Sequence, residues 1–168
     1  MALRRLFLVF ALCLCGQASA GTPWEAYLET PSAANARHVE AIAYAYGVES
    51  RWEEDIDILQ DQVIAGDRAA VGLAFRALCS ADGDLAETLC AIIGRSIRSH
   101  PALFLQALRV NSASLPLLPS LLGNLGEAYV DRPEAQAYER AARREALLSV
   151  KDPSLRSLRD QAVSALLK

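Results

Sequence analysis

The sequence predicts an all-α protein built from stacked antiparallel helix pairs. Helix-capping motifs recur along the chain, apolar residues follow helical spacing, and no run of alternating β-branched residues indicates a strand. The best strand candidate, residues 39–48, is rich in alanine, which favours a helix. The helix pairs could form an irregular bundle or a short solenoid.

The first predicted helices are defined by their start signals. Residues 22–25 combine a Thr cap, a Pro at the first helical position and a Glu that closes a capping box, so a short helix should end near Glu29. Residues 30–31, Thr-Pro, should begin a second helix that ends near residues 46–47. A further capping box at residues 50–53 should open a helix whose buried stripe is Trp52, Ile56, Leu59 and Val63.

The next two helices are separated by short polar turns. Gly66 and Asp67 should end one helix and cap another, and residues 80–84 should form a second turn. The expected buried residues of these two helices are Val71, Phe75 and Leu78, followed by Leu85, Leu89, Ile92, Ile93 and Ile97.

Proline-containing signals mark the helices of the C-terminal half. Pro116 and Pro119 interrupt residues 115–125, which predicts a turn followed by a brief, buried helix. Longer helices are predicted from residues 99–101 to Leu108, from residues 131–133 to about Val150, and from residues 152–153 onward with Leu155, Leu158, Ala162 and Leu166 on one face.

Two segments resemble the helical repeats of HEAT or armadillo proteins. In residues 66–71 and 151–156, a turn containing Asp leads into a helix that bears Arg and then small and large apolar residues. The resemblance covers about a third of the chain after the leader, with an irregular period. It implies a curved stack of helices with a concave binding surface.

Residues 1–20 have the pattern of a cleavable secretory signal. Arg4 and Arg5 precede an apolar run over residues 6–14, and a small-residue cleavage site lies between Ala20 and Gly21. The run is shorter than the about 20 apolar residues that a membrane span needs. We therefore expect a signal peptide at 1–20 and a single all-α domain at 21–168, located in the bacterial periplasm or secreted.

The cysteines bear on both anchoring and redox state. Cys13 and Cys15 raise the alternative of a lipid anchor, but neither follows the small residue usual in lipoprotein signals, so no stable membrane anchor is expected after cleavage. Cys79 and Cys90 are expected to form a disulfide that staples two neighbouring helices, because exported proteins meet an oxidising environment. Their spacing excludes a redox C-x-x-C motif, and no nearby Cys or His pair indicates zinc.

The charge balance restricts the class of partner. The chain has 17 Lys and Arg residues against 20 acidic ones; loss of Arg4 and Arg5 leaves 15, which changes the formal net charge from -3 to -5. A mildly acidic protein is a poor match for nucleic acid, which requires a basic face. We expect a protein partner, and the sequence does not predict the oligomeric state.

Acidic residues cluster at the start of the helix predicted after Ser50. The cluster comprises Glu49, Glu53, Glu54, Asp55, Asp57 and Asp61. Glu53, Asp57 and Asp61 lie four apart and share a helix face, which indicates a solvated face or, as alternatives, a surface for a basic partner or a metal ion. Asp82, Asp84 and Glu87 resemble a calcium loop only weakly, and turn formation and capping explain them.

Packing alone explains residues 123–132 less well than any other segment of the chain. Gly123 and Gly126 permit a helix stop or a close backbone approach, which favours a structural turn. The alternative is a recognition edge formed by the polar and aromatic residues Asn124, Glu127, Tyr129 and Asp131. Aromatic anchors for a partner are also expected at Trp52, Tyr44 and Tyr46.

No catalytic, metal or cofactor motif is present in the sequence. The chain has only His38 and His100 for imidazole chemistry, and it lacks the nucleophile-elbow, zinc-protease and phosphate-loop patterns. On the helix predicted from residues 131–133, the pairs of Arg140, Arg143 and Arg144 with Glu134, Glu139 and Glu145 are expected to be ordinary surface charge.

These observations predict an exported, non-enzymatic helical binding protein that recognises another protein in the periplasm, in one form an immunity-like inhibitor. Two alternatives stay open. The first is a small hydrolase of envelope polymers that uses paired carboxylates, and the second is a scaffold with no dedicated ligand.

Overall fold

The computed structural model describes residues 22–39, 42 and 52–167, and these residues form helices and no strand, which confirms the all-α prediction. The helices are α1 (Pro23–Glu29), α2 (Ala33–Ala36), α3 (Trp52–Ile64), α4 (Arg68–Leu78), α5 (Gly83–Ser99), α6 (Pro101–Val110), α7 (Leu118–Gly123), α8 (Pro133–Ser149) and α9 (Arg156–Ala165). Three short 3-10 helices lie between them: η1 (Ser112–Leu117), η2 (Glu127–Tyr129) and η3 (Pro153–Leu155). The segment predicted to be a signal peptide, residues 1–20, and its predicted cleavage site lie outside the described residues.

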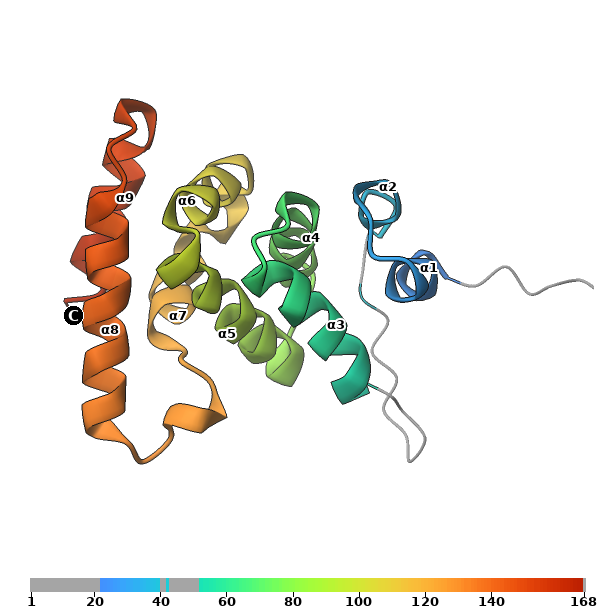
Figure 1. Cartoon of the computed structure of the whole chain (residues 1–168), viewed down its shortest axis with the longest axis horizontal. Coiled ribbons are helices and arrows are strands. Elements are labelled where there is room, and N and C mark those ends of the chain that lie inside the picture. Colours follow the sequence, from blue (N-terminus) through green and yellow to red (C-terminus); the bar gives the residue numbers. More distant parts are fainter. Residues whose placement is uncertain (1–21, 40–41, 43–51, 168) are drawn as a thin grey trace, which may run out of the picture.

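Neighbouring helices pack as pairs, and the pairs follow one another along the long axis of the molecule, from α1 and α2 to α8 and α9 (Figure 1). Contacts between pairs define two rows. In the first row α3 packs between α1 and α5, and α5 then contacts α7 and α8. In the second row α4 packs between α2 and α6, and α6 contacts α9. Each central helix therefore has neighbours both within its pair and along its row.

Local capping fixes several helix starts as predicted. The Thr22 hydroxyl accepts a hydrogen bond from the Glu25 amide at 3.2 Å, and the Glu25 carboxylate accepts one from the Thr22 amide at 2.6 Å. At the α3–α4 turn, Gly66 has a φ of 81°, and the Asp67 carboxylate accepts from the Ala70 amide at 2.7 Å. These interactions satisfy amides that have no partner within the helix itself.

The second predicted helix does not run unbroken from residues 30–31, and its predicted end at residues 46–47 lies outside the described residues. α2 starts after Ser32, whose hydroxyl accepts from the Asn35 amide, and it ends at Ala36. The Asn35 side chain donates to two carbonyls at the end of α1, at 3.0 Å each. Arg76 of α4 donates to the Ala36 carbonyl at 2.6 Å, which occupies an acceptor that a longer helix would use. Tertiary contacts thus end a helix that local propensity would have continued.

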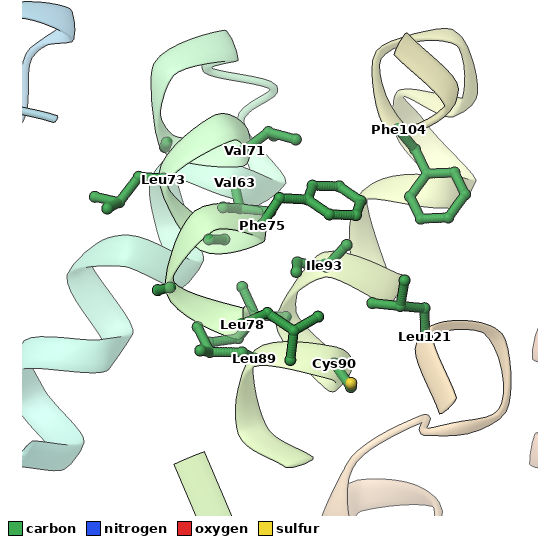
Figure 2. Packing of buried hydrophobic residues seen from close by; sticks show 14 of the residues in the cluster. Val63, Val71, Leu73, Phe75, Leu78, Leu89, Cys90, Ile93, Phe104 and Leu121 are labelled. Carbon is green, nitrogen blue, oxygen red and sulfur yellow. The ribbon is translucent and has the colours of Figure 1, made fainter. Parts of the chain in front are cut away.

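The core runs between α4, α5 and α6 (Figure 2). Phe75 of α4 faces Phe104 of α6, with ring centroids 6.0 Å apart, while Leu89 and Ile93 of α5 pack beneath them. The apolar residues predicted for the buried faces of α4 and α5 are all buried. At the N-terminal end, Trp24 stacks on Tyr27.

A charged side chain from α8 is also buried, which the sequence did not predict. Arg143 is 0% exposed and Glu139 is 5% exposed, so the expectation of surface charge is wrong for this pair. Arg143 Nε donates to Glu139 Oε1 at 3.1 Å, and Nη1 donates to the Leu122 carbonyl at 3.1 Å. Arg143 therefore satisfies the C-terminal end of α7, and this tertiary role explains its burial.

The environment of Arg143 is electrostatically balanced. Burial lowers the pKa of Arg143, and its hydrogen bond with Glu139 opposes that shift. Glu139 also accepts from the half-exposed Arg98 at 3.3 Å, and the Arg98 guanidinium lies 5.7 Å from the centre of the Tyr138 ring. The close approach of α5 to α7 and Arg143 depends on Gly94, where a side chain would collide with the Leu121 carbonyl.

The first prediction concerns this close approach. Gly94→Ala should lower the free energy of unfolding by about 1–3 kcal/mol, because the added Cβ would lie 2.5 Å from the Leu121 carbonyl oxygen and 2.7 Å from Arg143 Nη1. The matched control is Gly72→Ala in α4, where the nearest atom would be Arg76 Nη1 at 3.6 Å. That change should raise stability by about 0.5–1 kcal/mol. Urea unfolding measures both, and similar effects at the two positions would contradict the packing of Gly94.

The second prediction concerns the hydroxyl of Tyr27, which is buried and has no hydrogen-bond partner in the described part of the chain. Burial, with a smaller effect of Asp67, raises the pKa of Tyr27 to about 12. An unfolded tyrosine ionises near pH 10, so the unfolded state loses its proton first and the stability of the protein falls from pH 10 towards pH 12.

Tyr27→Phe should therefore be as stable as the original protein at pH 7, or more stable, because no hydrogen bond is lost. The difference in free energy of unfolding between the variant and the original protein should grow in favour of the variant by about 1.4 kcal/mol between pH 8 and pH 11. Denaturant titrations at pH 8 and pH 11 measure this difference. An advantage that does not change with pH would contradict the burial of the hydroxyl.

Candidate functional site

A cleft of about 720 Å³ lies between α3, α5 and the loop that joins α7 to α8. This loop is the orange segment between α7 and α8 in Figure 1. The apolar lining of the cleft includes Ile56 of α3 and Ala91 and Ile92 of α5. The loop contributes residues 123–130. Most of the segment that the sequence singled out therefore borders this cleft.

The charges that line the cleft are predominantly negative. Four acidic residues, all exposed, line it together with a single described cation, Arg95; these acids are Asp57, Asp84, Glu87 and Glu127. Carboxylates around a concave surface attract cations, although each exposed charge contributes little and is screened by salt. The cleft is therefore suited to a basic ligand.

Arg95 joins three parts of the cleft. Its Nη1 donates to the Gln60 side-chain oxygen of α3 at 2.6 Å, and its Nη2 would lie 3.3 Å from a Cβ placed on Gly126. Arg95 and Gln60 were not predicted as site residues from the sequence. Helical spacing could have identified Arg95. The side of α5 opposite its core stripe carries residues at 4, 3, 4 spacing: Asp84, Thr88, Ala91 and Arg95.

Asn124 holds the loop in position. Its Nδ2 donates to the Glu87 carbonyl of α5 at 2.9 Å, and its Oδ1 accepts from the Gly126 amide at 3.0 Å. Gly126 follows with a φ of 87°, a conformation that favours glycine. Leu125, between them, is buried. Asn124 thus has a positioning role in the cleft wall, in agreement with the interpretation of this segment as a structural turn.

The remaining loop residues differ in their relation to the cleft. Tyr129 is half-buried and lines it, and the Tyr129 carbonyl accepts from the Gln136 side chain at 2.9 Å. Glu127 lines the cleft and is exposed. Asp131 is exposed and does not line it, since it lies where the chain turns into α8 with a φ of 57°. The structure therefore brings together three of the four polar residues predicted for this segment.

The second predicted recognition surface is not described by the structure. Tyr44 and Tyr46 lie outside the described residues, and Trp52 is the first residue of α3, with a side chain that is also outside the description. Their role as aromatic anchors stays a prediction. Of the acidic cluster nearby, Asp57 and Asp61 are exposed as expected, and Asp57 faces the cleft.

The predicted bridge between Cys79 and Cys90 is wrong for this structure, because both thiols are free. Cys79 caps the end of α4, where its thiol lies 3.4 Å from the Phe75 carbonyl oxygen and 3.5 Å from the Ser114 hydroxyl. Cys90 is buried on α5 (Figure 2). Burial, with a smaller effect of Glu87, raises the pKa of the Cys90 thiol. Each sulfur thus has its own packing environment.

The histidines lie away from the cleft. His100 Nε2 lies 3.1 Å from the Ile64 carbonyl oxygen, and its ring fills the space beside Gly66. His38 is exposed after α2. Among the described residues, no three His, Cys, Asp or Glu side chains are grouped closely enough to hold a metal ion. None of the described helices combines the length and the apolar character that crossing a membrane requires.

The chain has no significant match among family models, curated protein sequences or solved structures. The arrangement of side chains in the cleft is therefore the basis for the functional argument.

The third prediction tests the role of Asn124. Asn124→Ala should lower the free energy of unfolding by about 1–3 kcal/mol, because it removes a donor to Glu87 and an acceptor for Gly126. Hydrogen exchange of the Gly126 amide should accelerate. Asn124→Asp keeps the acceptor and should protect this amide better than Asn124→Ala does. Unchanged exchange in both variants would contradict a positioning role.

Proposed function

We propose that the protein is an exported, non-enzymatic helical binding protein that recognises a basic segment of another protein in the bacterial periplasm. The observation that carries this proposal is the cleft, in which four carboxylates surround an apolar floor and a half-buried tyrosine. The leader at residues 1–20 supports export, and the excess of acidic residues supports a basic partner.

The lining suits the side chains of Lys and Arg in particular. Their long apolar stems would pack on Ala128 and Val130, two exposed apolar residues of the lining, while the charged group remains near the exposed carboxylates. Tyr129 adds an aromatic surface, and aromatic residues are frequent anchors in protein interfaces. The loop is already fixed by Asn124, so little ordering is required when a partner binds.

An immunity-like inhibitor is one form of this function. Such a protein would cover a basic surface of its target, and the acidic cleft would supply the complementary charge. The irregular stack of helix pairs would act as a rigid support for the cleft, in line with the resemblance to helical-repeat proteins.

The second candidate is an envelope-polymer hydrolase, and one observation favours it: carboxylates from α3, α5 and the loop converge on one cleft. A general acid of such an enzyme requires a carboxyl group with a raised pKa, commonly achieved by burial. The four acids of this cleft are all exposed. This exposure favours binding over catalysis.

The fourth prediction tests the cleft with matched charge changes. The cleft variant replaces its four acids by their amides: Asp57→Asn, Asp84→Asn, Glu87→Gln and Glu127→Gln. The control variant removes the same number of charges from exposed positions that do not line the cleft: Glu29→Gln, Glu134→Gln, Glu145→Gln and Asp160→Asn. Each protein is produced with its leader in the native host and recovered under native conditions with its partners.

A specific partner should be recovered with the original protein and the control but depleted at least tenfold with the cleft variant, and its binding should weaken as salt increases. Equal recovery with the cleft variant would reject the cleft as the binding site. Loss of solubilising activity on isolated envelope polymer in the cleft variant alone would instead favour the hydrolase. No partner in repeated recoveries, together with no such activity, would reject both functions.

A further inference from the structure

A second hollow, of about 580 Å³, lies directly beside the cleft. Both hollows are lined by Glu87 of α5 and by Gly123 and Asn124 of the loop. Because Asn124 is hydrogen-bonded to α5, this shared wall is fixed in place. The two hollows are therefore adjacent parts of one surface, and the wall that they share is held by the Asn124–Glu87 hydrogen bond.

The second hollow differs from the cleft in its chemistry. Five of its lining residues are apolar: Leu78, Ala86, Cys90, Leu117 and Pro119. Leu117 is 36% exposed, so part of this apolar wall faces solvent. Among the described residues, Glu87 is the only acidic one in its lining, and it is shared with the cleft. Such a hollow favours an uncharged, apolar group.

Cys90 contributes to the apolar wall rather than to a reactive site. Its side chain is 4% exposed and its pKa is raised by burial, so the thiol stays protonated at neutral pH. A protonated, buried thiol packs like a small apolar group. The second hollow is consequently a candidate for side-chain packing and not for covalent chemistry.

We propose that the two hollows bind neighbouring side chains of a single polypeptide segment, with a basic side chain in the cleft and a large apolar side chain in the second hollow. This inference rests on the proposed function, and it specifies the partner sequence further. The hollows share Glu87, Gly123 and Asn124, and alternate side chains of an extended segment lie on the same face, so the motif chosen for the test places a Lys or Arg two residues from a Leu or similar residue.

The charge pattern supports this occupant over a purely apolar one. Glu87 lines both hollows, so any group entering the second hollow passes close to a carboxylate. A ligand with a basic group beside its apolar group would place a positive charge near Glu87, and this attraction is absent for an apolar ligand alone.

The fifth prediction uses capped seven-residue peptides built on a Gly-Ser background. One peptide carries Arg and Leu two positions apart, and three others carry Arg with Ser, Glu with Leu, or Ser with Leu at the same positions. Binding to the purified protein is measured by amide chemical shifts. The Arg-Leu peptide should bind about tenfold more tightly than the Arg-Ser peptide and should shift amides at both hollows.

Two protein variants change the second hollow in opposite ways. Ser120→Trp, at an exposed position of its lining, should fill it, while Leu117→Ser should remove part of its apolar wall. Each should abolish the advantage of Arg-Leu over Arg-Ser without weakening the binding of Arg-Ser. Ser164→Trp, on an exposed part of α9 that lines neither hollow, is the matched control and should leave both affinities unchanged.

The possible results separate this inference from the proposed function. Equal binding of the Arg-Leu and Arg-Ser peptides would overturn the two-hollow inference and leave the basic-segment function in place. Equally tight binding of the Ser-Leu peptide would show a site for apolar ligands alone and would also overturn it. Absence of shifts with every Arg peptide at millimolar concentration would overturn both.

Discussion

The buried guanidinium of Arg143 is the constraint on which the position of the cleft depends. It joins the C-terminal carbonyls of α7 to Glu139 of α8, and the space that it needs exists because residue 94 of α5 is a glycine. A buried charge left without partners costs several kcal/mol, so this arrangement has few alternatives of similar energy. The end of α7 is thereby held against α5, and the cleft loop begins immediately after it.

Helix α5 connects the stability of the fold to the geometry of the site. One side of the helix contributes Leu89 and Ile93 to the core, and the other presents Glu87 and Arg95 to the cleft. A change in the tilt of α5 would disturb both faces together, and densely packed cores resist such displacements. The Asn124 contacts extend this rigidity to the loop. A partner would thus meet a preformed surface, and rigid docking is the expected mode of binding.

Interactions between residues close in sequence were predictable, and those between distant elements were not. The Thr22 capping box and the Asp67 cap join residues three positions apart, so their residue types are sufficient to identify them. The early end of α2 depends on Arg76, 40 positions from its acceptor, and the burial of Arg143 depends on α7. The expectation of export likewise suggested a cysteine bridge, but the compartment does not determine where each thiol packs.

Because contacts between distant elements cannot be predicted from sequence patterns, the loop was identified but the cleft was not. The residues 123–130 stand out because they combine two glycines with polar and aromatic side chains, whereas the opposite wall comes from ordinary surface positions of α3 and α5. The two hollows have separate consequences for a basic partner. Exposed carboxylates mainly accelerate encounter, because their long-range attraction is strongest before contact and is screened by salt. Burial of an apolar side chain beyond the Asn124 wall mainly slows dissociation. A partner that uses both hollows would therefore gain both association rate and residence time from adjacent parts of one rigid surface.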